Sequence, residues 1–219
     1  MKKEIVRYDP SNPAHREAVR RIVYDTGFGG ETVAPYFDNF DLFADMLTLY
    51  YTDYDASHNF LAMADGEIAG YLLGCPDTPV CDSVTKREIY PALLRGIISG
   101  RYKLTPKDLL YIRRSLSAMI RGEHIATPTD VYPAHLHIDF LPQYRRAGLG
   151  SKIMLEYMDY LRGLGVKGVH LGTSSAHRSA LPFYAKLGFS VYSRLRMTET
   201  VFAPLHPQDL YGIVCVKLL

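Results

Sequence analysis

The chain has 219 residues, of which 47% are hydrophobic and 22% charged, and this composition is typical of one globular domain of ordinary size. The formal net charge of +2 gives no basic field that would indicate a nucleic-acid partner. Cys75, Cys81 and Cys215 form no Cys-x-x-Cys pair, which argues against a disulfide framework and favours a reducing compartment, the cytoplasm. No apolar run is long enough for a membrane span or a signal peptide, so no membrane partner is expected.

The N-terminal third of the chain alternates between predicted strands and helices. Hydrophobic periodicity predicts a strand over 4–8, a helix over 13–25, a flexible loop over 26–31 and a helix over 40–52. Ser11 or Asn12 is the expected N-cap of the first helix. Strands over 59–64 and 67–73 flank Asp65-Gly66, a dipeptide typical of a two-residue hairpin turn.

The segment 75–131 carries two further predicted helices, over 85–98 and 106–120. Thr105 is the expected N-cap of the second helix, because Asp108 follows three residues later as in a capping box. We favour a helical hairpin packed on the core, and an acceptor lid or a dimer surface is the alternative.

The most informative stretch is Arg145-Arg146-Ala147-Gly148-Leu149-Gly150, which lies between a predicted strand over 134–141 and a predicted helix over 149–163. Glycines allow a left-handed backbone, and a helix N-terminus offers unpaired N–H groups and a positive dipole. The turn is therefore a candidate phosphate seat. It is not a P-loop, because no lysine follows Gly150, and it lacks the third glycine of the dinucleotide fingerprint.

The sequence that follows this turn completes a known pattern. Arg-x-x-Gly-x-Gly over 145–150, a strand over 167–173 and Ala-x-x-Phe-Tyr-x-x-Leu-Gly-Phe over 180–189 together resemble the GNAT family of acetyl-CoA-dependent N-acetyltransferases. The run from Tyr132 to Asp139 also resembles the acetyltransferase-like domain of O-GlcNAcase and its stand-alone bacterial relatives.

The resemblance implies an α/β (α+β) fold, with a central mixed, mostly antiparallel sheet of about seven strands flanked by helices. It implies one domain over 1–219, in which 75–131 is a helical insertion before the fourth strand. Predicted strands over 189–197 and 210–218 close the sheet. The chain departs from the family at His177, where Asn is frequent, and at Pro182, which is tolerated only near the first turn of a helix.

The activity that the resemblance implies is transfer of an acetyl group from acetyl-CoA to a primary amine by direct attack in a ternary complex, without a metal. The alternative is a pseudo-acetyltransferase that binds acetyl-CoA, or no cofactor, and serves as a recognition module. The backbone N–H of Phe140 is the implied donor to the thioester oxygen. The implied cofactor-binding residues are Phe140, Leu141, Arg145, Arg146, Ala147, Gly148, Leu149, Gly150, Ser151, His177 and Tyr184.

Three catalytic side chains are nominated. The match to the Phe-Tyr pair implies that Tyr184 protonates the leaving thiolate, and a buried packing tyrosine is the alternative. Strand alternation places His135, His137 and Asp139 on one face, which suggests a wet cleft. Asp139 ranks first as the base and His137 second, while hydrogen-bonded structural histidines remain an equal alternative. The sequence offers no third ligand beside this His-x-His pair, so no zinc site is expected.

The amine acceptor is left open among a small amine, an antibiotic, a peptide N-terminus and a lysine side chain, and a homodimer is also left open. In this fold the acceptor enters beside the loop over 27–37 and the loop around His206. The candidate contact residues in the first loop and just after it are Phe28, Glu31, Tyr36 and Asp38.

Overall fold

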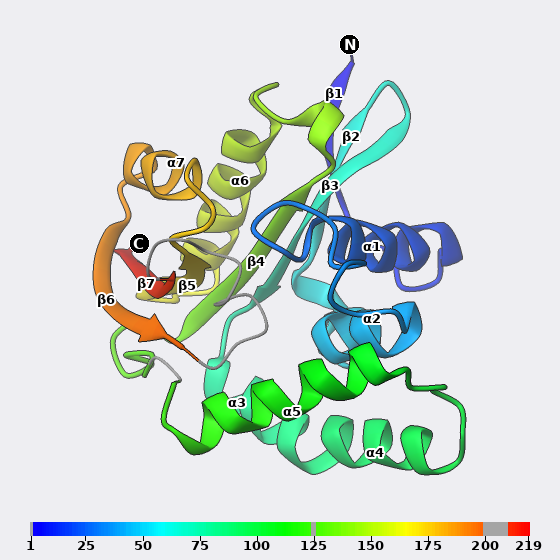
Figure 1. The fold of residues 1–219 in the computed structure, drawn as a ribbon. Helices are drawn as coiled ribbons and strands as arrows, with labels where there is room; N and C mark the ends of the chain where they lie inside the picture. Colours follow the sequence, from blue (N-terminus) through cyan, green and yellow to red (C-terminus); the bar gives the residue numbers. More distant parts are fainter. Residues whose placement is uncertain (1, 124–125, 199–209) are drawn as a thin grey trace.

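The computed structural model describes residues 2–123, 126–198 and 210–219. Its strands are β1 (Lys3–Arg7), β2 (Phe60–Ala64), β3 (Glu67–Cys75), β4 (Ala134–Phe140), β5 (Gly168–Ser174), β6 (Ser190–Met197) and β7 (Leu210–Leu218). They form one sheet in the order β1-β2-β3-β4-β5-β7-β6, shown in Figure 1. Every neighbouring pair is antiparallel except β4 and β5, which are parallel. The predicted mixed, mostly antiparallel sheet is confirmed.

One face of the sheet is covered by α6 (Leu149–Gly163), and α7 (Ala180–Lys186) lies toward the edge of the sheet that ends with β6 (Figure 1). The apolar stripe of α6 packs on Ala134 and Leu136 of β4 in one buried cluster. The helix predicted over 149–163 is confirmed, and its buried residues recur at helical spacing: Leu149, Ile153, Met154, Tyr157, Met158 and Leu161. Helical periodicity in the sequence thus fixed which side of α6 faces the sheet.

The opposite face is covered by α1 (Pro13–Thr26) and α2 (Phe40–Leu49). Asn12 caps α1, since its side chain accepts a hydrogen bond from the backbone N–H of Ala14. The chain continues from α2 through a π-helical turn, Tyr50–Tyr54, which accounts for the predicted end of that helix near Thr52.

The insertion contains α3 (Thr78–Val84), α4 (Tyr90–Ile98) and α5 (Pro106–Ile120), and a π-helical turn joins α3 to α4. The helical region therefore begins seven residues before the predicted start at Thr85, because Asp77 caps α3. The capping box of Thr105 and Asp108 is confirmed, and the buried Asp108 carboxylate also accepts from the N–H of Asp38 (2.7 Å) and Asn39 (3.1 Å).

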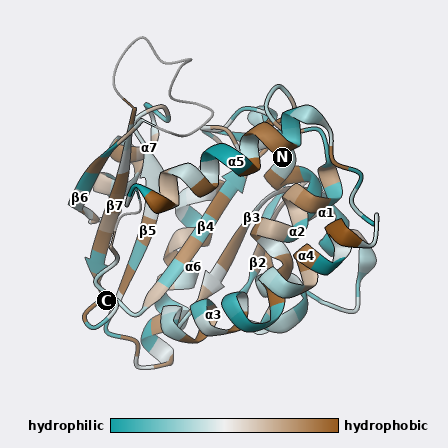
Figure 2. Cartoon of the chain, turned by 60° about the horizontal axis from the view of Figure 1, so that its bottom comes forward, coloured by the Kyte–Doolittle hydropathy of each residue, from teal (hydrophilic) through white to brown (hydrophobic). Residues whose placement is uncertain are grey.

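These bonds tie the start of α5 to the start of α2, and apolar side chains of the insertion join the α1–α2 core. Hydrophobic and hydrophilic residues are interspersed along α5 in Figure 2. Within the described residues, no helix combines the length and the hydropathy that crossing a membrane requires.

The sheet opens between β4 and β5. Their pairing is confined to Ala134 with Val169 and His135 with His170. On its other edge β4 stays paired with β3 as far as Gly70 and Phe140. The second half of β4 therefore has one free edge, in the middle of the molecule, where a ligand can reach the backbone.

Candidate active site

The N-terminus of α6 has the backbone geometry of an anion-binding site. Gly148, at the N-cap position, has φ +84° and provides no side-chain cap, and the first helical bond runs from the N–H of Lys152 to its carbonyl. The N–H groups of Leu149, Gly150 and Ser151 consequently have no partner within the helix. They lie at the positive end of its dipole, so they suit a phosphate or pyrophosphate.

A cleft of about 380 Å³ opens at this end of α6, and we call it the α6 cleft. Its lining includes eight of the predicted cofactor-binding residues, Phe140, Arg145, Arg146, Gly148, Gly150, Ser151, His177 and Tyr184. Leu141, Ala147 and Leu149 do not line it. Leu149 is buried in the core, and Leu141 packs on the α1–α2 side and donates its N–H to the carbonyl of Ala69 (3.0 Å).

That last bond fixes the direction of the neighbouring N–H. Because the N–H of Leu141 points toward β3, the alternation of an antiparallel pair turns the N–H and carbonyl of Phe140 to the other edge, where β4 and β5 diverge. Gly70 makes room for the Phe140 ring, since a Cβ at Gly70 would come within 2.4 Å of it. The proposed donor to the thioester oxygen thus faces the open side of the strand.

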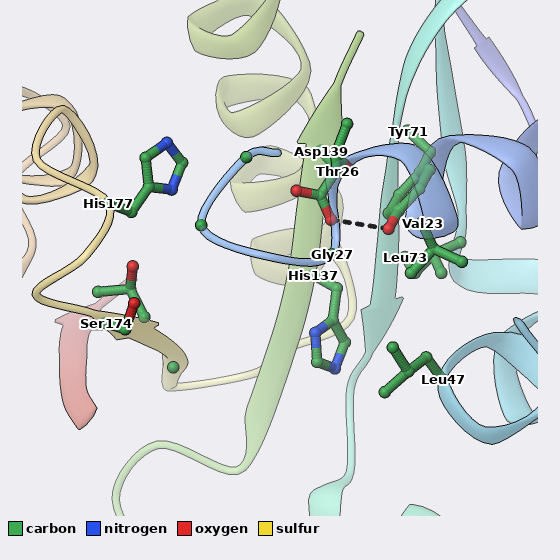
Figure 3. A pocket seen from close by; sticks show the side chains of 14 residues that line it. Val23, Thr26, Gly27, Leu47, Tyr71, Leu73, His137, Asp139, Ser174 and His177 are labelled. Carbon is green, nitrogen blue, oxygen red and sulfur yellow. Dashed lines mark hydrogen bonds between the residues drawn. The ribbon is translucent and has the colours of Figure 1, made fainter. Parts of the chain in front are cut away.

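A second cavity, of about 210 Å³, lies on the α1–α2 side of the same strand, and we call it the β4 pocket (Figure 3). Polar groups from β4, β5 and the end of α1 share its wall with Leu47 and Leu73. Gly30, Asp139 and His177 line both this pocket and the α6 cleft. The two cavities therefore meet at Asp139.

The Asp139 carboxylate accepts a 2.7 Å hydrogen bond from the hydroxyl of Tyr71, drawn in Figure 3. Burial raises the pKa of Asp139 to about 6, although the Tyr71 bond, the positive charge of Arg145 and the nearby Thr26 hydroxyl each act to lower it. The carboxylate is mostly ionised at neutral pH and still basic enough to accept a proton.

His137 also opens into the β4 pocket, and its ring lies 5.4 Å from that of Tyr51. Loss of hydration next to the surrounding protein lowers the pKa of His137, and the charge of His170 acts in the same direction. The imidazole is therefore neutral at neutral pH, with a lone pair available for hydrogen bonding. Strand alternation placed His137 correctly on the same face as Asp139.

His135 has a different environment. Its two ring nitrogens lie 2.6 Å from the hydroxyl of Tyr51 and 2.7 Å from that of Thr78, and burial lowers its pKa well below the usual range. The thiols of Cys75 and Cys81 and a ring nitrogen of His135 lie within 4.8 Å of one another, a grouping that the sequence did not reveal and that does not include His137. Because both nitrogens already have hydroxyl partners, the contacts are those of a hydrogen-bonded structural histidine.

Tyr184 lies on α7 with its side chain 8% exposed, and it lines the α6 cleft. Burial raises the pKa of Tyr184, and the negative charge of Asp139 raises it further. The phenol is thus protonated at all working pH values and can donate a proton into the cleft. His177 stands just before α7, and burial lowers its pKa, as does the charge of Arg145.

The loop after α1 reaches the β4 pocket through its glycines. Gly27, Gly29 and Gly30 line the pocket, whereas none of the four predicted acceptor contacts, Phe28, Glu31, Tyr36 and Asp38, does so. The Phe28 and Tyr36 rings pack together, and Asp38 pairs with Lys107 and Thr105. The predicted contact around His206 lies outside the described residues.

Tyr71 and Thr26 were missed at the sequence level, although both affect Asp139. The hairpin over 59–73 was predicted, but only the register of β3 against β4 brings Tyr71 opposite Asp139. That pairing joins residues 68 positions apart and leaves no local pattern in the sequence.

The sequence model of the acetyltransferase (GNAT) family matches residues 115–189, a range that includes β4, α6, β5 and α7. The crystal structure of SsHAT is 25% identical, with a TM-score of 0.73 over 100% of this chain and 98% of that one. The Drosophila melanogaster polyamine N-acetyltransferase is 16% identical, with a TM-score of 0.56 over the full length of both chains. A GNAT-family acetyltransferase of Streptococcus pneumoniae is 16% identical, with a TM-score of 0.56 over 100% of this chain and 99% of that one.

The last two structures show the shared fold alone. The narrower resemblance to the O-GlcNAcase domain stays a prediction. The family match over residues 115–189, the fold shared over the whole chain and the two motifs agree with one another: they support an acyltransferase that carries a GNAT-type acetyltransferase domain.

Proposed function

We propose that the chain transfers the acetyl group of acetyl-CoA to a primary amine by direct attack in a ternary complex. The observation that carries the proposal is the junction of two cavities at Asp139, one beside an anion-binding helix terminus and one beside a buried base. A recognition module without catalysis would need the α6 cleft, but it would not need a second pocket, on the opposite side of β4, that is lined by ionisable side chains.

The α6 cleft has the donor set that acetyl-CoA requires. The three N–H groups at the start of α6 that have no partner within the helix suit its pyrophosphate, and exposed Arg146 adds positive charge nearby. The free edge of β4 suits the amide groups of the pantetheine arm. The N–H of Phe140 would then stabilise the charge that develops on the thioester oxygen, which is worth ~3 kcal/mol in comparable sites.

In the transfer, the amine nitrogen bonds to the thioester carbon and the C–S bond breaks. Asp139 takes the proton that the nitrogen loses, and Tyr184 gives its proton to the sulfur. Both groups line the cavity in which they would act. The coupling of Tyr184 to the charge of Asp139 supports their placement around one reaction centre. None of the three cysteines lines either cavity, so a covalent relay has no support.

The acceptor that fits the β4 pocket is a small amine without an acidic group. Among the residues that the structure describes, Asp139 is the one carboxyl group in its lining, and neither Lys nor Arg lines it. Such a wall attracts an ammonium ion and offers no partner to a carboxylate or phosphate. Among similar folds, the Drosophila melanogaster enzyme forms N-acetylagmatine, the product of a cationic amine. The free, buried cysteines support a cytoplasmic location.

The first experiment is a calorimetric titration with acetyl-CoA and, alongside, with CoA. Micromolar binding is expected, followed by thiol release when a panel of monoamines, polyamines and lysine peptides is added. Binding without amine-dependent thiol release would favour the recognition module. No binding of either ligand would overturn the proposal.

A further inference from the structure

The side chain of Arg145 turns away from the start of α6. Its Nε donates to the carbonyl of Phe140 (2.9 Å), and its terminal nitrogen Nη2 donates to the carbonyl of Gly30. One guanidinium therefore bridges the end of β4 and the turn after α1, and Arg145 and Gly30 are 115 residues apart in the sequence. The GNAT resemblance implies only a cofactor-binding role for this arginine and gives no sign of its contact with the loop.

The turn that Arg145 holds is tightly built. Phe28 and Glu31 exchange two backbone hydrogen bonds of 2.8 Å, and the N–H of Gly30 donates to the carbonyl of Thr26 (3.0 Å). Gly30 has φ +96°, and a Cβ there would come within 3.1 Å of the guanidinium. A side chain at this position would meet both backbone strain and the arginine, so glycine allows the close approach.

Gly30 lines both the β4 pocket and the α6 cleft, so its turn forms part of the wall between them. Gly29 faces the segment just before α7, where a Cβ would meet Ala176 at 3.6 Å. The turn is thus held between Arg145 on one side and the approach to α7 on the other. A movement of the end of β4 would therefore move the turn as well, because the charged guanidinium of Arg145 is hydrogen-bonded to both.

We propose that Arg145 is a positioning residue that fixes the 28–31 turn as the wall between the two cavities, so that CoA in the α6 cleft orders the β4 pocket. The second half of this statement rests on the proposed function, because it requires CoA to bind in the α6 cleft. The first half concerns the free protein alone. Arg145 also acts electrostatically on both shared ionisable groups, since its charge lowers the pKa of Asp139 and of His177.

The test is hydrogen–deuterium exchange of the amides of Phe28, Gly30 and Glu31 in wild type, Arg145→Met and Arg145→Lys. Arg145→Met keeps the aliphatic stem and removes every donor, while Arg145→Lys keeps the charge and can reach only one carbonyl. We expect exchange at the three amides to rise at least tenfold in Arg145→Met and less in Arg145→Lys. Exchange in α6 is expected to stay at the wild-type rate, which shows that the fold is intact.

A second arm adds CoA, with Arg87→Met as the control at an exposed arginine that lines neither cavity. In wild type and Arg87→Met, saturating CoA should slow exchange at the turn, whereas in Arg145→Met bound CoA should leave it fast. A third readout is the acid limb of the pH–rate profile, which should move to higher pH in Arg145→Met because the charge that lowers the pKa of Asp139 is gone.

The outcomes separate the two claims. Unchanged exchange at the turn in ligand-free Arg145→Met overturns the positioning role, whatever CoA does. Calorimetric CoA binding to wild type without slower exchange at the turn overturns the coupling. Absence of CoA binding overturns the proposed function and the coupling together, while the ligand-free arm still decides whether Arg145 holds the turn.

Discussion

Tyr71 and Asp139 stand directly opposite each other on the antiparallel strands β3 and β4, and the Tyr71 hydroxyl donates a 2.7 Å hydrogen bond to Oδ2 of Asp139. Tyr71 itself is 1% exposed, so the bond has a rigid donor. It stabilises the ionised carboxylate against the burial that raises its pKa. Burial and the Tyr71 bond act in opposite directions, and together they leave Asp139 with a pKa of about 6 at the place where the two cavities meet.

Replacing Asp139 by Asn tests the base. Wild-type activity is expected to fall as the pH drops through about 6, because protonation of Asp139 removes the acceptor for the amine proton. Asp139→Asn should lower kcat by roughly 10²- to 10⁴-fold and abolish this limb of the pH profile. Rates of thiol release between pH 5 and 8 decide the question, and a limb that persists in the variant would assign the base elsewhere, with His137 the next candidate.

The same substitution has the opposite effect on stability. The pKa of Asp139 is higher in the folded protein than its ordinary value of 3.8, so the folded state binds the proton more tightly. The stability that this group contributes is fully present below pH 3.8 and is lost as the pH rises through about 6. Asp139→Asn should therefore gain in melting temperature relative to wild type between pH 5 and 8. A difference in melting temperature that stays constant with pH would contradict the raised pKa.

Tyr71→Phe tests whether the opposite strand tunes the base. Removal of the hydroxyl takes away a bond that lowers the pKa of Asp139, so the acid limb of the pH profile should move to higher pH. The variant should also lose ~1 kcal/mol of stability. Tyr8→Phe is the matched control, because the buried Tyr8 hydroxyl has no hydrogen-bond partner among the described residues, so its removal should neither shift the pH profile nor lower stability. Equal pH profiles for the two variants would remove Tyr71 from this role.

The local parts of the site were predictable from the sequence. Alternation along 134–141 placed His137 and Asp139 on one face, and helical periodicity placed the apolar stripe of α6 against the sheet. The Gly148 turn was visible because a left-handed backbone at a strand–helix junction nearly requires glycine. Each of these features depends on residues close together in the chain.

The long-range parts were not predictable. The register that pairs Tyr71 with Asp139, and the bridge from Arg145 to Gly30, depend on how the sheet and the loop after α1 come together in space. The contacts of His135 also follow from packing, since Tyr51 arrives from the π-helical turn after α2. A single sequence leaves open whether such a histidine is catalytic or structural.

Tyr184→Phe tests the acid. The phenol donates its proton only as the thiolate leaves, so its loss should lower kcat by roughly tenfold or more while the calorimetric affinity for acetyl-CoA stays within about threefold of wild type. Tyr192→Phe, at an exposed tyrosine of β6, is the control and should behave as wild type. Unchanged kcat in Tyr184→Phe would leave this residue as part of the packing around the cleft.

Gly172→Val tests the β4 pocket as the place where the amine binds. Gly172 lies on β5 in the pocket wall, and a Cβ there would have no atom of the described residues within 4 Å, so the valine would fill part of the pocket without a clash with them. β-branched residues also suit a strand. We expect the KM for the best amine of the panel to rise roughly tenfold or more, as loss of fit in a small site does, with acetyl-CoA affinity unchanged. Gly163→Val, at the far end of α6 and also with open space around it, controls for the substitution itself. Weaker acetyl-CoA binding with an unchanged KM for the amine would show that the two substrates occupy the cavities in the reverse arrangement.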